Sequence, residues 1–207
     1  PLLLFFKNSA KLTIIITAIQ VFTSSFAAYA FAKLHFKGRD LLFILYICTI
    51  AVPWQVYMVP QYIMVGKMSL TDSHLGMIMM QSFTAMGVFL MRQFYTSIPD
   101  ELCEAARIDG ATRGQYFWKI ALPLLIPSIK SAAILSMVGS LKYFDLIYVM
   151  TGGGPGTATE LMATYMYKES FKNFNMGYGS AIAGGMFILI TMVSMITMKL
   201  INGKQED

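Results

Sequence analysis

Charged residues are scarce in this sequence. Asp, Glu, Lys and Arg make up 13% of its 207 residues and hydrophobic residues 56%, whereas about a quarter of an ordinary soluble domain is charged. An ordinary soluble domain is therefore excluded. The net charge of +5 does not indicate nucleic-acid binding, because Lys and Arg fall mainly in short segments between apolar runs, where they set membrane topology.

Cysteine and histidine are also rare. Cys48 lies in an apolar run and Cys103 in a polar stretch, so the two offer neither a disulfide framework nor metal-ligand spacing. His35 and His74 stand alone in connecting segments. We therefore predict two free thiols and no metal site. The 17 methionines are spread through the apolar runs and are typical of lipid-facing or adaptable packing positions.

Motifs for nucleotide binding and hydrolysis are missing as well. The chain has no Gly-x-x-x-x-Gly-Lys-[Ser/Thr] loop to hold ATP phosphates. It has neither His-Glu-x-x-His nor Gly-x-Ser-x-Gly, the signatures of two classes of hydrolase. We expect a chain that is not an enzyme and holds no cofactor, so that any ATP-driven work depends on a separate ATPase.

Long apolar runs dominate what is present. A transmembrane helix needs about 20 apolar residues, and Pro53 and Pro60 predict a kink in the second run. We predict an all-α polytopic membrane protein, a single transmembrane domain over residues 1–207, with about five spans. The predicted spans are 12–32, 41–66, 75–91, 124–150 and 178–198.

The basic residues are unevenly divided between the two sets of connecting segments. By the positive-inside rule, the polar stretch between the third and fourth runs is cytoplasmic. Five spans then put the N-terminus outside, and the chain begins at Pro1 without an initiator Met or a signal peptide. We therefore expect one more span upstream, six in the intact protein. The richer set holds Lys33, Lys37, Arg39, Arg92, Arg107, Arg113, Lys119, Lys199 and Lys204; the poorer set holds Lys7, Lys11, Lys67, Lys168 and Lys172.

The polar stretch, about residues 97–123, predicts two short helices. Ser97 followed by Asp100 and Glu101 predicts the start of the first, because a hydroxyl can cap early N–H groups and acidic residues suit the positive end of the helix dipole. Gly110 predicts its end. A helix of about ten residues is marginal by itself in water, so it needs a surface to pack against.

The second helix has signals of its own. Thr112 and Gln115 have the spacing of a capping box, and Pro123 predicts the end of the helix. Apolar residues at helical spacing lie between these points. They are Tyr116, Phe117, Ile120 and Ala121.

Small side chains on the first helix suit a knob pushed into a cleft, with Leu102 beside them and ion pairs around the rim. The alternative is an amphipathic helix lying on lipid headgroups. The spacing of the whole stretch favours the first interpretation, because it resembles the "EAA" loop of the permease subunits of binding-protein-dependent ABC importers. The residues that carry the resemblance are Glu104, Ala105, Ala106, Gly110, Ile120, Leu122 and Pro123.

The resemblance covers nearly the whole chain and is to the carbohydrate-uptake branch, similar to the maltose permease subunits. It implies a second homologous permease subunit, a cytoplasmic ABC ATPase dimer that holds ATP and Mg, and an extracytoplasmic sugar-binding protein. It also implies a bacterial or archaeal cell (inner) membrane and sugar import by alternating access. Its coupling helix would contact the ATPase through Glu104, Ala105, Ala106, Arg107, Asp109 and Gly110.

Polar residues in the fourth run fall at i, i+3, i+4 and i+7, one stripe of a helix near the bilayer midplane. Hydroxyls beside an aromatic ring suit a sugar, which offers many hydroxyls and an apolar face. The alternative is close packing between helices through small residues. By the resemblance, the substrate pocket includes two residues of the preceding run. The candidates are Ser136, Gly139, Ser140 and Tyr143, with Ser82 and Phe83.

Charge also interrupts this run, which is costly unless it is paired or faces water. Lys142 and Asp145 have the spacing of an ion pair on one helix face; the alternative is a polar lining at the outer mouth of a pathway. The glycine-rich residues 151–157 predict turns. They form either a flexible connector or, by the resemblance, a loop facing the docked binding protein through Gly152, Gly153, Gly154 and Pro155.

The chain departs from the family pattern in two ways. Cys103 stands where the family often has an acidic residue. The part up to the EAA loop resembles one permease type of these heterodimers, whereas Tyr143, Phe144 and Asp145 resemble the other, so the type stays open. A permease for another solute, such as phosphate, a polyamine or a peptide, is the nearest alternative, followed by a membrane enzyme or a channel.

Overall fold

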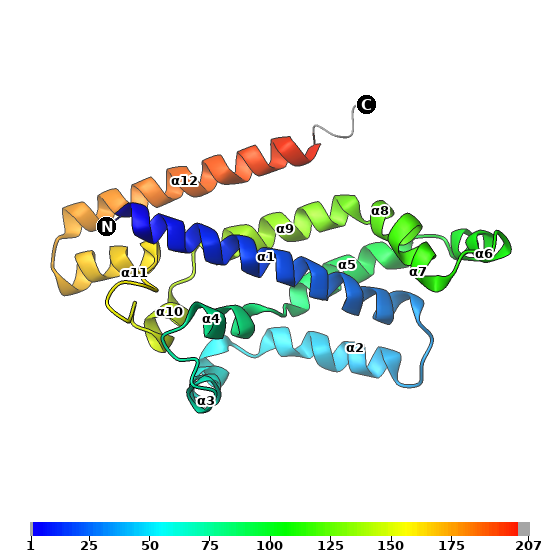
Figure 1. The fold of residues 1–207 in the computed structure, drawn as a ribbon, viewed down its shortest axis with the longest axis horizontal. Coiled ribbons are helices and arrows are strands. Elements are labelled where there is room, and N and C mark those ends of the chain that lie inside the picture. Colours follow the sequence, from blue (N-terminus) through cyan, green and yellow to red (C-terminus); the bar gives the residue numbers. More distant parts are fainter. Residues whose placement is uncertain (1, 203–207) are drawn as a thin grey trace. The chain divides into compact units, whose positions relative to one another are not determined.

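The computed structural model describes residues 2–202, apart from the side chains of residues 107, 113 and 200–202. The described residues form helices joined by turns, with no β-strand among them, so the predicted all-α class is confirmed. Figure 1 shows the order of the helices along the chain. They group into two compact units, which are described separately.

Unit 1 comprises Pro1–Ile19, Pro53–Ser82 and Ile134–Asp207. Its core includes Leu12, Val65 and Ile147, each about 1% exposed. The short helix α11 and the π-helical turn η3 fold back against the start of α12 (Figure 1). The elements are the first part of α1 (Leu2–Lys33), α3 (Trp54–Lys67), α4 (His74–Gln81), the end of α9 (Ile126–Leu141), α10 (Asp145–Met150), α11 (Met162–Tyr167), η3 (Lys168–Lys172) and α12 (Met176–Asn202).

Unit 2 comprises Gln20–Val52 and Phe83–Ala133. Its core surrounds the fully buried Tyr95, whose hydroxyl lies 3.0 Å from that of Ser25. Helices α2 and α5 contact each other. The elements are the second part of α1, α2 (Arg39–Cys48), η1 (Thr49–Ala51), α5 (Ala85–Ser97), α6 (Asp100–Ile108), α7 (Arg113–Tyr116), η2 (Phe117–Ala121), α8 (Leu122–Leu124) and the start of α9.

Two of the described helices, α1 and α12, are long and apolar enough to cross a membrane. The number rises to five if each pair of helices separated by a short break is one span. These pairs are α2 with α3, α4 with α5, and the helices that meet at Leu125, so the prediction of about five spans agrees with the larger number. The second predicted span does break at a proline, since η1 ends at Ala51 and α3 begins just after Pro53.

The fourth predicted span is wrong beyond Leu141. Helix α9 ends there, and residues 142–144 are not helical. Lys142 and Asp145 therefore do not share a helix face, and no ion pair joins them among the described residues. The break has a local cause, because Gly139 and Ser140 are weak helix formers near the end of α9, and Asp145 favours the first turn of a new helix.

Two predicted helix boundaries are also corrected. The Ser97 hydroxyl donates to the carbonyl of Phe94 at 2.8 Å and so serves the end of α5, not the start of α6. Pro123 does not end its helix, which continues to Leu124 and bends at Leu125. A π-helical turn precedes the proline. Such a turn is compatible with a residue that cannot complete the regular hydrogen-bond ladder.

Candidate coupling helix and outer loop

Helix α6 is fixed at its first turn by a residue from the end of α1. The Lys33 ammonium donates to the Asp100 carboxylate at 2.6 Å and to the carbonyl of Ile98 at 2.7 Å. The Lys33 side chain is 9% exposed and that of Asp100 82%. The hydrogen bond and charge of Lys33 hold the pKa of the Asp100 carboxyl below its ordinary value. The start of α6 is thus tied to α1.

The two faces of α6 differ. Ala106 is 6% exposed and belongs to the same buried cluster as Tyr116. Glu104, Ala105 and Asp109 are exposed, whereas Ala106, which the coupling-helix interpretation also counts among the contact residues, is buried. Ile108, which the sequence reasoning did not select, is 87% exposed. Ile108 follows Glu104 by four positions and so lies on the same face of the helix, which is the sequence signal that could have identified it. The side chain of Arg107 lies outside the described residues.

Gly110 ends α6, as predicted. Its φ of +81° lies in the left-handed region that glycine adopts without steric cost. The N–H of Ala111 then donates to the carbonyl of Ala106 at 2.8 Å. This is the six-residue closure of a glycine-ended helix, so the direction in which the chain leaves α6 is set by local geometry.

The predicted capping box of the second helix is present. The N–H of Thr112 donates to the Gln115 side chain at 2.8 Å, and the N–H of Gln115 to the Thr112 hydroxyl at 3.3 Å. Tyr116, Phe117 and Ala121 are buried, and the ring of Phe117 lies 5.0 Å from that of Tyr29 on α1. The second helix therefore packs its apolar face on α1.

Arg92 is a second connecting residue that the sequence reasoning counted only toward topology. Its Nε donates to the carbonyl of Phe31 at 3.3 Å, and its guanidinium lies 3.6 Å from Asp40 and 3.9 Å from the centre of the Phe43 ring. One side chain of α5 thus contacts both α1 and α2. The sequence signal for these contacts was a basic residue, Arg92, at the end of one span and an acidic residue, Asp40, at the start of another helix.

A cavity of about 500 Å³ lies behind α6. Lys33, Asp100, Glu104 and Tyr116 line it, together with Cys103, the residue that departs from the family pattern. Cys48 and Cys103 are free thiols, as predicted. Within the described part of the chain, His, Cys, Asp and Glu form no group that could hold a metal ion.

The predicted substrate stripe is only partly on one helix. Ser136, Gly139 and Ser140 belong to α9, but Tyr143 follows its end, so the i+7 relationship is wrong. Ser140 is 2% exposed, and its hydroxyl has no partner among the described residues. The Tyr143 hydroxyl instead donates to the side chain of Gln81 at 2.7 Å. Gln81 directly precedes Ser82, another of the candidates.

Ser82 and Phe83, the two substrate-binding candidates from the preceding span, differ in their surroundings. The Ser82 hydroxyl donates to the carbonyl of Ile78 at 2.7 Å, within the end of α4. Phe83 belongs to unit 2 and is 72% exposed. The structure therefore brings Ser82 and Tyr143 to the same region of unit 1, while the role of all six residues in substrate binding stays a prediction.

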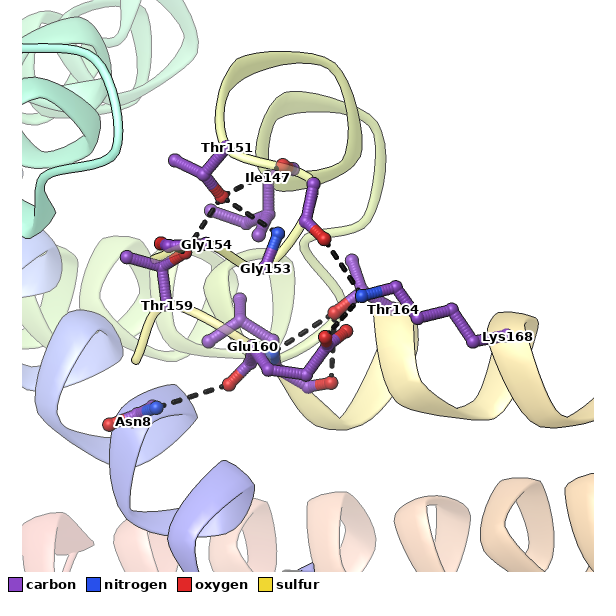
Figure 2. A network of polar contacts seen from close by, with 11 residues as sticks. Asn8, Ile147, Thr151, Gly153, Gly154, Thr159, Glu160, Thr164 and Lys168 are labelled. Carbon is purple, nitrogen blue, oxygen red and sulfur yellow. Dashed lines mark hydrogen bonds and ion pairs between the residues drawn. The ribbon is translucent and has the colours of Figure 1, made fainter. Parts of the chain in front are cut away.

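The glycine-rich loop is built from hydrogen-bonded turns (Figure 2). The Thr159 hydroxyl donates to the carbonyl of Gly154 at 2.5 Å, and its oxygen lies 2.8 Å from Thr151 Oγ1. Gly152 and Pro155 are exposed, Gly154 is half-buried and Gly153 is buried. Residues 156–158, which the sequence reasoning left out, are exposed and extend the same surface. The loop thus has ordered internal bonding, unlike a free connector.

Comparison with known proteins identifies the class. Residues 20–206 match the family of binding-protein-dependent transport system inner membrane components, and the chain belongs to that family. The chain is thus a membrane component of a transport system, in agreement with its apolar helices.

Several curated transporter proteins are similar in sequence to parts of this chain. ORF1 of Caldicellulosiruptor sp., named as an ABC transporter permease protein, is 65% identical over 54% of this chain and 79% of its own length. The multiple sugar-binding transport system permease protein MsmF of Streptococcus mutans is 42% identical over 56% of this chain and 40% of its own. The arabinooligosaccharides transport system permease protein AraQ of Halalkalibacterium halodurans is 35% identical over 67% and 50%. The chain thus spans about half the length of most such relatives.

Two solved structures share the fold. A bacterial ABC transporter that imports the acidic polysaccharide alginate matches all of this chain and 75% of its own, with a TM-score of 0.79 and 19% identity. An alginate transporter in complex with an alginate pentasaccharide-bound periplasmic protein matches 99% of this chain and 78% of its own, with a TM-score of 0.73 and 18% identity. At these identities the likeness establishes the fold.

Proposed function

We propose that the chain is a permease subunit of an ATP-driven ABC importer that moves a sugar or oligosaccharide from an extracytoplasmic binding protein into the cytoplasm. Family membership supports the transport role, and the names of MsmF and AraQ support sugar as cargo. The observation that carries the proposal is α6, a nine-residue helix anchored on one face and exposing Glu104, Ala105 and Ile108 on the other. A helix so short is marginal in water by itself, so its exposed face is suited to packing against a partner.

The proposed mechanism uses the contacts of unit 2. A cytoplasmic ATPase dimer, which binds ATP and Mg, closes on α6 and moves it. The Lys33–Asp100 pair and the burial of Ala106 transmit this movement to α1 and to the packed second helix. The spans then change from an inward-facing to an outward-facing arrangement, in which a second permease subunit completes the pathway. In this topology α6 is cytoplasmic.

The test is ATP hydrolysis by the complete transporter in lipid nanodiscs. The candidate binding protein is added alone and with each of a panel of oligosaccharides. We expect stimulation that needs both the binding protein and one sugar. If the chain purifies without an ATPase and no binding protein changes any activity, the proposal fails.

Ile108 offers a more direct test of docking. Ile108→Asp adds a charge to the exposed face, at a side chain that is 87% exposed and therefore contributes little packing to unit 2. We expect loss of copurification with the coexpressed ATPase and unchanged thermal unfolding of the permease. Ile108→Val is the matched control and should retain the ATPase. Full assembly of the Asp variant would contradict docking through this face.

A non-sugar or acidic cargo is the second candidate. Lys142 is exposed and lines a groove of about 430 Å³ in unit 1 with the hydroxyl-bearing Thr191 and Ser194. A cation within a membrane region favours an anionic group nearby. One relative, UgpE of Yersinia pestis, is named for sn-glycerol-3-phosphate transport and is 33% identical over 76% of this chain. The cargo panel therefore includes glycerol phosphate and a uronic-acid oligosaccharide, and Lys142→Gln should weaken only the response to these anions.

A further inference from the structure

Beneath the outer loop lies an ion pair that the proposed coupling mechanism does not use. The Glu160 side chain is 3% exposed and pairs with the ammonium of Lys168 at the start of η3. The same ammonium donates to the carbonyl of Gly152 at 2.7 Å. In Figure 2, Lys168 reaches back from its helix to Glu160. One cation thus joins a buried carboxylate to the backbone of the loop.

Gly153 lies directly against this pair. Its φ is +94°, and a Cβ built there would clash with the Glu160 carboxylate and come close to the Lys168 ammonium. The position therefore requires glycine for both its backbone conformation and its lack of a side chain. The close approach leaves the loop little freedom to shift while the pair is formed.

The far side of the loop is fixed from α1. The Asn8 amide donates to the carbonyl of Ala158 at 2.9 Å and to that of Glu160 at 3.2 Å. Inside the loop, the N–H of Gly153 donates to the Thr151 hydroxyl at 3.1 Å. The exposed crest, residues 155–158, is thus supported at both ends by buried or half-buried polar contacts, and it carries no charge of its own.

We propose that the Glu160–Lys168 pair is a positioning device that holds residues 152–158 in the shape to which an extracytoplasmic binding protein docks. The inference rests on the proposed function and names the part of the chain that meets that partner. Because residues 155–158 are small and uncharged, their side chains would make few contacts with the binding protein. The affinity of the loop for that protein therefore depends on a fixed backbone shape. A loop that is already ordered before binding loses less conformational entropy when the partner binds, which improves affinity.

The experiment measures ATP hydrolysis by the complete transporter in nanodiscs against the concentration of sugar-loaded binding protein. Glu160→Gln keeps the shape of the side chain and removes its charge. We expect the half-maximal concentration to rise roughly tenfold while the rate at saturation is retained, because docking and not hydrolysis is weakened. Lys168→Arg, which keeps the cation, should remain near the wild type.

Two neighbours on η3 serve as matched controls. The Glu169 carboxylate accepts a hydrogen bond from the Asn175 amide at 3.3 Å, and the Lys172 ammonium lies 5.3 Å from the centre of the Tyr148 ring. Neither belongs to the loop network, so Glu169→Gln and Lys172→Gln should leave the half-maximal concentration unchanged. A Glu160→Gln transporter with the half-maximal concentration of the wild type would overturn the proposal.

Hydrogen exchange provides an independent readout if Glu160→Gln does not assemble. The amides of Gly153 and Gly154 donate within the loop at 3.1 and 2.8 Å, so loss of the pair should speed their exchange in the permease alone, in Glu160→Gln and in Lys168→Gln. Unchanged exchange in both variants overturns the proposal. If the wild-type transporter responds to no binding protein, the proposed function fails, while exchange still shows whether the pair orders the loop.

Discussion

Two lysine–carboxylate pairs of this protein differ in their surroundings. In unit 1, the carboxylate of the pair is buried, since the Glu160 side chain is 3% exposed and that of Lys168 26%. In unit 2, the carboxylate is exposed, since the Asp100 side chain is 82% exposed, although that of Lys33 is 9% exposed. Removing one partner of a buried pair leaves an uncompensated charge, whereas water and salt screen an exposed pair. Breaking the first pair is therefore expected to cost more stability than breaking the second.

The largest expected effect comes from breaking the buried pair. Lys168→Met removes the cation and leaves Glu160 buried without its partner, which should lower the free energy of unfolding of the region around the glycine-rich loop by about 3–5 kcal/mol. Thermal unfolding of the purified permease in detergent measures this. Lys172→Met, four residues away in the same π-helical turn, is the control, and an equal loss in both variants would contradict the distinction.

A change at Gly110, where α6 ends, should disturb the function of α6 more than loss of the Lys33–Asp100 pair at its start. Proline cannot adopt the φ of +81° found at Gly110, so Gly110→Pro should redirect the chain after α6 and uncouple ATP hydrolysis from uptake. Gly110→Ala can reach this conformation at a cost of about 1–2 kcal/mol and should retain partial coupling. Uptake by reconstituted vesicles is the measurement, and normal uptake by the proline variant would argue against a coupling role.

The exposed pair itself should have the smallest effect, and one that depends on conditions. Because the folded pKa of Asp100 lies below its ordinary value of 3.8, the pair contributes stability above that value and loses it as pH falls further, through the folded pKa. Asp100→Asn should therefore lower the melting temperature slightly at pH 7 and low salt, and hardly at all at high salt. A salt-independent decrease would show that the carboxylate acts through its short hydrogen bond to Lys33 and not through a charge that salt screens.

Local sequence signals predicted the helix–glycine–helix arrangement of residues 100–124 well. The capping box of Thr112 and Gln115 and the ending at Gly110 depend on residues a few positions apart, so their spacing is visible in the sequence. The same reasoning failed at Lys142 and Asp145. An apolar run does not reveal that its helix ends at Leu141, because short helices with similar composition can continue on the other side of a break.

The sequence by itself determined the all-α membrane class, the approximate spans, the polar helix–glycine–helix stretch and the family, since each follows from composition or from close spacing. Only the tertiary structure decided which charges meet. Lys33 and Asp100 are 67 positions apart, and Asn8 reaches a carbonyl 152 positions away. No local pattern specifies such contacts, because they depend on how the packed helices bring distant parts of the chain together.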